Sequence, residues 1–95
     1  MSRLNHTKVD VTTSSTQVVA GNTERSYLLI QNISDTAGDL MTGGADAVAD
    51  EGIRLAAGDS VEFSAKNGNL FFTSVAGIHA GAGTKRVTVT EAEYR

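Results

Sequence analysis

Hydrophobic and polar residues alternate along several short stretches of the chain, which is the period-two pattern of a half-buried β-strand. From Lys8 to Thr13 this pattern puts Val9 and Val11 on one face. The run from Arg25 to Ile33 is the strongest, because both of its alternating faces carry large apolar side chains. We therefore expect a central strand at residues 25–33 that is covered on both sides.

Further short stretches with strand-like patterns follow one another, separated by turn-forming residues. They lie at residues 17–20, 40–42, 52–55, 60–64, 70–76 and 85–90. A four-residue hairpin connection is expected at residues 56–59, and Asn67-Gly68 is the pair preferred for a type I′ hairpin. The pattern predicts an all-β chain: a small antiparallel β-sandwich or barrel of about seven to eight short strands.

The chain shows no internal domain boundary, so residues 8–95 are expected to form a single β-sandwich domain. Residues 1–7 precede the first alternating stretch and carry only Leu4 as an apolar anchor besides the initial Met. We interpret them as a polar N-terminal arm, mobile in an isolated monomer. Arms of this kind often become ordered on a neighbouring subunit.

Composition indicates a thin core, because Leu, Ile, Val and Phe together make only 22 of the 95 residues. The chain has no Cys, which excludes disulfides, Cys-ligated zinc and thiol catalysis. Its net charge is −3 with no basic stripe, which disfavours direct nucleic-acid binding. The apolar runs are far too short to span a membrane, and no signal peptide is visible at the start, so we expect synthesis and use in the cytoplasm unless an assembly carries the protein elsewhere.

Two histidines are candidates for chemistry at neutral pH. His6 lies in the expected arm and His79 in a glycine-rich region, with no acidic residue near either in the sequence. We interpret both as surface or loop histidines rather than a metal pair or general base. Asp46, Asp50 and Glu51 faintly resemble a calcium loop, but their spacing is not that of an EF-hand, and a solvated acidic loop is the preferred interpretation.

The glycine-rich run from Gly77 to Lys85 has some features of a phosphate-binding loop. Its order is Gly-Thr-Lys and a strand follows, whereas a P-loop needs Gly-Lys-Ser/Thr at the start of a helix. No Gly-x-Ser-x-Gly turn is present, and no Ser is paired recognisably with a His. We therefore predict no catalytic residues, no cofactor, no metal and no enzymatic activity.

The adjacent aromatic residues Phe71 and Phe72 must point to opposite faces if both lie in a regular strand. One of them then belongs to the core. The other faces a second sheet, solvent or a partner.

Three segments resemble those of a family of small virion structural proteins of tailed bacteriophages. They are the strand Arg25-Ser26-Tyr27-Leu28-Leu29-Ile30-Gln31-Asn32, the segment Gly52-Ile53-Arg54-Leu55-Ala56-Ala57-Gly58, and the closing strand Val87-Thr88-Val89-Thr90-Glu91. The resemblance covers roughly residues 17–91. It implies a capsid decoration, or cement, protein: a β-sandwich that binds the outer face of an assembled head and bridges capsid subunits.

On this interpretation the protein stabilises the capsid, its partner is the major capsid protein, it forms a homo-oligomer, and it is located on the exterior of the virion. The expected partner contacts are Ser2, Arg3, Leu4, Asn5, His6, Thr7, Phe71, Phe72, Tyr94 and Arg95. Two alternatives remain open. One is a tail, fibre or head-tail accessory protein used in host attachment. The other is a carbohydrate-binding β-sandwich, which the scarcity of aromatic residues disfavours.

Overall fold

A computed structural model describes residues 2–79, 81 and 85–94 of the chain, and within them it contains strands and no helix. The strands are β1 (Ser2–Val11), β2 (Thr16–Val19), β3 (Arg25–Asn32), β4 (Gly38–Met41), β5 (Ile53–Leu55), β6 (Ser60–Ser64), β7 (Val75–His79) and β8 (Lys85–Tyr94).

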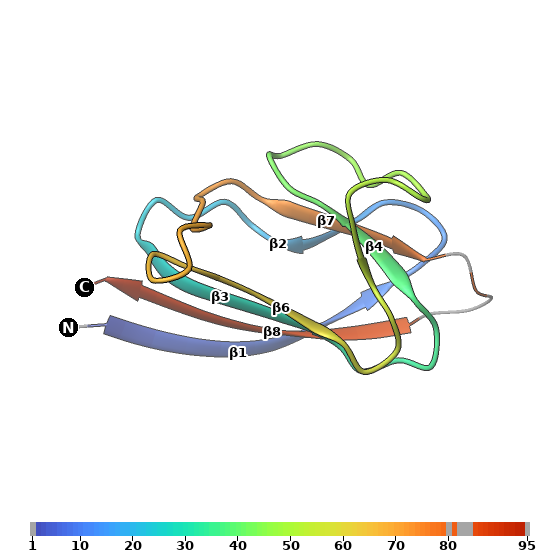
Figure 1. Cartoon of the computed structure of the whole chain (residues 1–95), viewed down its shortest axis with the longest axis horizontal. Helices are drawn as coiled ribbons and strands as arrows, with labels where there is room; N and C mark the ends of the chain where they lie inside the picture. The colour runs from blue at the N-terminus through green and yellow to red at the C-terminus, as the bar shows by residue number, and fades with distance from the viewer. Residues whose placement is uncertain (1, 80, 82–84, 95) are drawn as a thin grey trace.

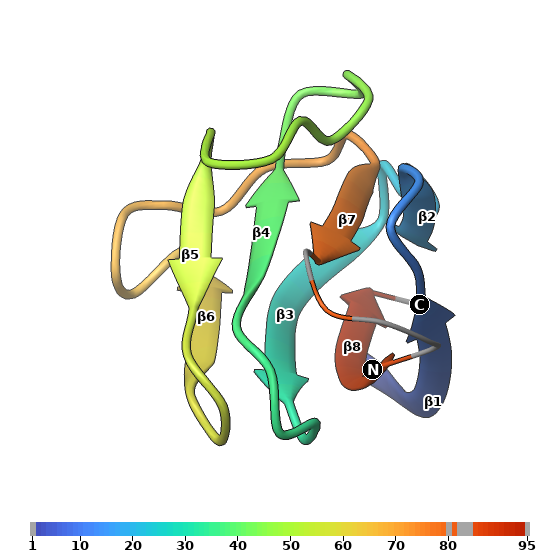
Figure 2. The same cartoon turned by 90° about the vertical axis from the view of Figure 1, so that its right-hand side faces the viewer.

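The eight strands form two antiparallel four-stranded sheets that pack face to face. One sheet has the order β1-β8-β3-β6 and the other the order β2-β7-β4-β5. Figure 1 shows the first sheet below the second, and Figure 2 shows the strands of both sheets from one end of the molecule. The prediction of an all-β sandwich of about eight strands is confirmed.

The core lies between the sheets and is built from the side chains that alternation along each strand directs inward. Leu28 and Ile30 from β3 and Val75 from β7 are fully buried at its centre. The remaining buried members are Val11, Val18, Leu40, Leu55, Phe63, Val87 and Val89. Small aliphatic residues dominate this list, in keeping with the thin core expected from composition.

The first strand begins earlier than the sequence pattern predicted. β1 starts at Ser2 instead of Lys8, and it pairs with β8 from Ser2 opposite Tyr94 to Val11 opposite Lys85. It runs without interruption across the boundary expected between an arm at 1–7 and a domain at 8–95. Polar residues 2–7 are accepted in a strand because cross-strand hydrogen bonds to β8 stabilise them without an apolar face.

The two hairpins predicted on either side of β6 are wrong. β6 belongs to one sheet, whereas β5 before it and β7 after it belong to the other. Asn67-Gly68 does lie in a turn, with Gly68 N–H donating to the carbonyl of Ala65 at 3.1 Å, but the chain then crosses to the second sheet. The strand predicted at residues 70–76 starts only at Val75, because residues 70–74 form this crossing.

The expectation that β3 is covered on both sides is also wrong for the chain taken alone. Leu28 and Ile30 face the second sheet and are buried. Tyr27 and Leu29, on the opposite face, are only partly buried, and Ile33 just beyond the strand is 51% exposed. The described chain divides its strands four and four between the sheets and has no element left to cover this outer side.

Candidate interaction surface

Most of the residues predicted as partner contacts meet at one end of the sandwich. Pairing of β1 with β8 sets Ser2 opposite Tyr94, so the two ends of the described chain lie side by side (Figure 1). Residues 71–73 reach the same end, because Arg25 at the start of β3 donates to the carbonyl oxygens of Phe71 and Thr73. Arg95 lies outside the described residues. We call this region the terminal end of the sandwich.

Large apolar side chains are exposed at the terminal end. Leu4 on β1 is 57% exposed and Phe72 in the loop before β7 is 48% exposed. His6 is also exposed, and its Nδ1 forms a hydrogen bond of 3.0 Å with Thr90 Oγ1 on the neighbouring strand. The terminal end therefore exposes two large apolar side chains, Leu4 and Phe72, and the polar side chain of His6.

The two phenylalanines differ in accessibility, although neither lies in a strand. The Phe71 ring packs edge-on against Phe63, with centroids 4.8 Å apart and planes at 82°. Its face lies 5.4 Å from the guanidinium carbon of Arg25. The Phe71 side chain thus packs within the molecule, whereas the Phe72 side chain is exposed and accessible to a partner.

Arg25 organises the terminal end, and the sequence pattern did not single it out. Its side chain is fully buried and forms an ion pair of 2.7 Å with Glu91. The guanidinium group also donates to three carbonyl oxygens, those of Phe71 and Thr73 at 3.0 Å and that of Ala20 at 2.8 Å. A single buried cation therefore fixes two loops and two strands. The only hint in the sequence is a charged residue at the head of an apolar strand.

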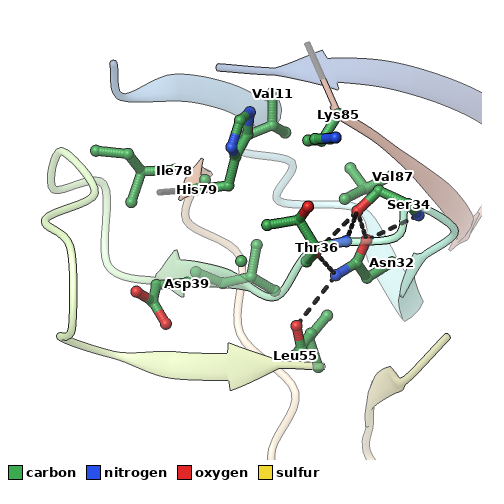
Figure 3. A pocket seen from close by; sticks show the side chains of 13 residues that line it. Val11, Asn32, Ser34, Thr36, Asp39, Leu55, Ile78, His79, Lys85 and Val87 are labelled. Carbon is green, nitrogen blue, oxygen red and sulfur yellow. Dashed lines mark hydrogen bonds between the residues drawn. The ribbon is translucent and has the colours of Figure 1, made fainter. Parts of the chain in front are cut away.

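Asn32 plays a similar part at the other end of β3. Its side-chain amide donates to the carbonyl oxygens of Thr36 at 2.8 Å and Leu55 at 3.1 Å (Figure 3). Its backbone N–H donates to Asp59, and its carbonyl accepts from Gly58, both at 2.8 Å. These bonds hold the connection between β5 and β6 against the end of β3.

The segments that carry the resemblance to virion proteins therefore meet in space. Arg25 in the first segment pairs with Glu91 in the third, and Asn32 at the end of the first binds Leu55 and Gly58 of the second. All of these groups satisfy buried polar atoms of the chain itself. These residues of the three segments therefore stabilise the fold.

A small cavity lies beside Asn32 and His79 (Figure 3). Its volume is about 20 Å³, which has room for a single water and not for an organic substrate. His79 was expected in a loop, but it ends β7 and is only 4% exposed. Strand alternation places it inward with Val75 and Gly77, which explains its burial. Neither ring nitrogen has a hydrogen-bond partner among the described residues.

The acidic loop is partly neutralised by Arg54 on β5. The guanidinium pairs with Asp50 at 2.6 Å and with the buried Asp39 at 2.9 Å. Hydrogen bonds from Arg54, supported by the backbone N–H of Asp50, hold the pKa of the Asp39 carboxyl below its usual value of 3.8. No group of three metal-binding side chains occurs in the described part of the chain.

The glycine-rich run is described only in part. Gly77, Ile78 and His79 of the glycine-rich run belong to β7 rather than to a loop, while residues 80 and 82–84 lie outside those described. None of the described residues forms a helix long and apolar enough to cross a membrane.

The chain is similar to a known protein in its structure, but its sequence matches no family model. No family model matches the chain, and no curated protein matches it. Among solved structures, a chain of Bacillus endospore appendages, described as a novel family of disulfide-linked pili, superposes with a TM-score of 0.52. The alignment covers 98% of this chain and 86% of that chain at 17% sequence identity. The two proteins therefore share a fold.

Proposed function

We propose that the protein is a non-enzymatic structural subunit of a bacteriophage virion. It is a decoration protein that binds the outer face of the assembled head through the terminal end of its sandwich and bridges copies of the major capsid protein. Its location is the exterior of the virion.

The observation that carries this proposal is the meeting of the predicted contact residues at one end. Leu4 and Phe72 come from opposite parts of the chain, yet both are exposed at the terminal end. Decoration of a shell needs such a surface on a rigid subunit and needs no reaction centre. Burial of these side chains on a lattice would add stability to a fold whose own core is thin, because binding to the folded state shifts the folding equilibrium.

The resemblance to virion proteins is a second support, because its three segments act together in this chain. Their residues Arg25, Glu91 and Asn32 hold the loops at both ends of β3. In this chain they form part of the framework that presents the terminal end.

Cryo-EM of virions with and without the protein tests the assignment directly. We expect additional density on the capsid exterior only when the protein is present. Density confined to the tail would instead favour a host-attachment role, and no difference on the head would refute the decoration assignment.

Variants test whether the terminal end makes the contact. We expect Leu4→Ser and Phe72→Ser each to weaken co-sedimentation with heads assembled without the protein by about tenfold. Val48→Ser is the matched control, because Val48 is 47% exposed in the loop between β4 and β5. Equal binding by all three variants would show that the contact lies elsewhere.

A subunit of a self-assembling filament is a second candidate, favoured by the shared fold with the endospore appendage chain. The present chain has no Cys, so disulfides could not link its copies. Negative-stain microscopy of the purified protein separates the two candidates. Long filaments of the protein alone would favour this function over capsid decoration.

A further inference from the structure

The sheet β1-β8-β3-β6 has an outer face that points away from the second sheet, and no strand of the described chain lies over it (Figure 2). Cross-strand pairing arranges its side chains in rows. The first row holds Leu4, Ala92, Tyr27 and Ser64; the second His6, Thr90, Leu29 and Glu62; the third Lys8, Thr88, Gln31 and Ser60. A hydrogen bond within the second row, between His6 and Thr90, and one between the first and second rows, from Tyr27 to Glu62, place these groups on one side.

This outer face carries an apolar patch that extends from β3 across β8 to the β1 edge, with polar side chains around it. Tyr27 and Leu29 lie on β3, next to Ala92 on β8, and Leu4 extends the patch onto β1. A strand with large apolar side chains on both faces is typical of a sheet that is covered on both sides. The second sheet covers only one side of β3, so another molecule is needed to cover the other.

The outer face carries opposite charges at its two edges, so the face of one copy can be complementary in charge to the same face of a second copy. Lys8 lies on β1 at one edge of the sheet, and Glu62 lies on β6 at the opposite edge. Tyr27 Oη donates to Glu62 at 2.6 Å and Asn67 donates to it at 2.9 Å, and both bonds lower the pKa of this carboxyl. Asp10 and Arg86, in the next row, pair with each other at 3.1 Å.

A two-fold axis parallel to the strands, above the line between β8 and β3, would place β1 of one copy over β6 of the other. Lys8 and Glu62 belong to adjacent rows. Stacked sheets pack about 10 Å apart, which a lysine side chain can cross. Each copy would therefore contribute one Lys8 and one Glu62 to two equivalent ion pairs, while the apolar middle of one face covers that of the other.

We propose that two copies of this chain pair face to face through the outer face of the β1-β8-β3-β6 sheet. The face measures roughly 20 Å by 20 Å from strand spacing and rise, so the dimer would bury about 800 Å² in total. This area is below that of a standard stable interface, so the dimer is weak in solution and fits subunits held close together in an assembly. The pairing does not depend on the capsid assignment. It shares Leu4 with the terminal end but not Phe72, so Phe72→Ser tests capsid binding separately from the dimer.

Analytical ultracentrifugation of the full chain over micromolar to millimolar concentration measures the dimer. We expect a concentration-dependent monomer–dimer equilibrium. Lys8→Glu and Glu62→Lys should each raise its dissociation constant about tenfold, because each converts both attractive pairs into repulsive ones. The double exchange Lys8→Glu with Glu62→Lys should restore the dissociation constant to within about twofold of the original.

Two further variants separate pairing from folding. Glu62→Gln keeps an acceptor for Tyr27 and Asn67, and should weaken the dimer by a few-fold through loss of charge. Leu29→Lys should abolish dimerisation, whereas Val48→Lys, on an exposed loop, should leave it unchanged. Urea unfolding of each variant confirms that the subunit remains folded.

Three results would overturn the proposal. The first is a protein that stays monomeric at every concentration, and the second is a double-exchange variant that dimerises as weakly as either single variant. The third is an equal effect of Leu29→Lys and Val48→Lys on the dissociation constant of the dimer. None of them bears on capsid binding, which co-sedimentation with heads measures separately. Loss of capsid binding with an intact dimer would instead count against the proposed function alone.

Discussion

Arg25 and Arg86, two of the arginines that form ion pairs across neighbouring strands, lie in opposite surroundings. Arg25 is fully buried against Glu91, whereas the Arg86 and Asp10 side chains are 49% and 54% exposed. We expect Arg25→Met to lower the free energy of unfolding by about 3 kcal/mol, because it leaves Glu91 and three carbonyls without their donor. Arg86→Met should change it by less than about 1 kcal/mol. Urea titration measures both, and equal losses would contradict the organising role of Arg25.

Two glycines with the same φ provide a second comparison between residues. Gly52 and Gly58 both have φ of 84°. A Cβ at Gly52 would collide with the backbone carbonyl of Leu40, whereas one at Gly58 would meet nothing within 4 Å. We expect Gly58→Ala to cost about 1 kcal/mol from its φ alone, and Gly52→Ala to cost about 3 kcal/mol or more. Thermal unfolding tests this order. A smaller loss of stability for Gly52→Ala than for Gly58→Ala would show that the backbone of β4 can shift to make room for the added Cβ.

At the scale of the strand, the sequence allowed the position of most strands to be predicted, because alternation is a local property. The run 60–64 matches β6 in both bounds, and the run 25–33 differs from β3 by one residue. Strand partners could not be predicted in the same way. β1 pairs with β8, at opposite ends of the chain, so no turn between them fixes the register.

The candidate site was predictable only in part, for the same reason. The sequence indicates Leu4 as the apolar residue of the expected arm and Phe72 as one of two adjacent aromatic residues in an expected strand, and the structure exposes both. The roles of Arg25 and Asn32 depend on loops that are distant in sequence, so no local pattern reveals them. His79 was misplaced because the glycines around it suggested a loop, although Gly77 lies within β7.

Strand position within the sheets should determine the stability of backbone hydrogen bonds. β3 pairs with both β8 and β6, and its Leu28 and Ile30 are fully buried. β5 has three residues and pairs only with β4. We expect the amides of Leu28 and Ile30 to exchange with solvent only on global unfolding, and those of β5 to exchange through local opening. Hydrogen exchange by NMR measures the difference, and equally slow exchange in β5 would be the contrary result.

At the scale of the whole molecule, stability should fall in acid because of Asp39. Its pKa is lowered in the folded state, so the folded protein binds fewer protons than the unfolded chain. The stabilisation is therefore complete above about pH 5 and is lost progressively as the pH falls below the usual value of 3.8.

The variant Asp39→Asn tests this contribution. We expect its unfolding free energy to be lower at pH 7 and to vary less between pH 5 and pH 2. Asp35→Asn is the control, because Lys85 lowers the pKa of Asp35 as well, but that side chain is 84% exposed and screened by water. Identical pH profiles for Asp39→Asn and the unmodified protein would refute the assignment.

Pairing of Ser2 with Tyr94 also affects how the molecule can be rearranged. Cα atoms directly opposite each other in an antiparallel pair lie only about 5 Å apart, so a short glycine linker can join the two ends. New ends could then be opened in the exposed turn at residues 43–46, between β4 and β5. Such a circular permutant keeps every strand pair and moves the attachment point of a fused protein. The sandwich is therefore suitable as a display scaffold to which a fused protein can be attached at either of two places.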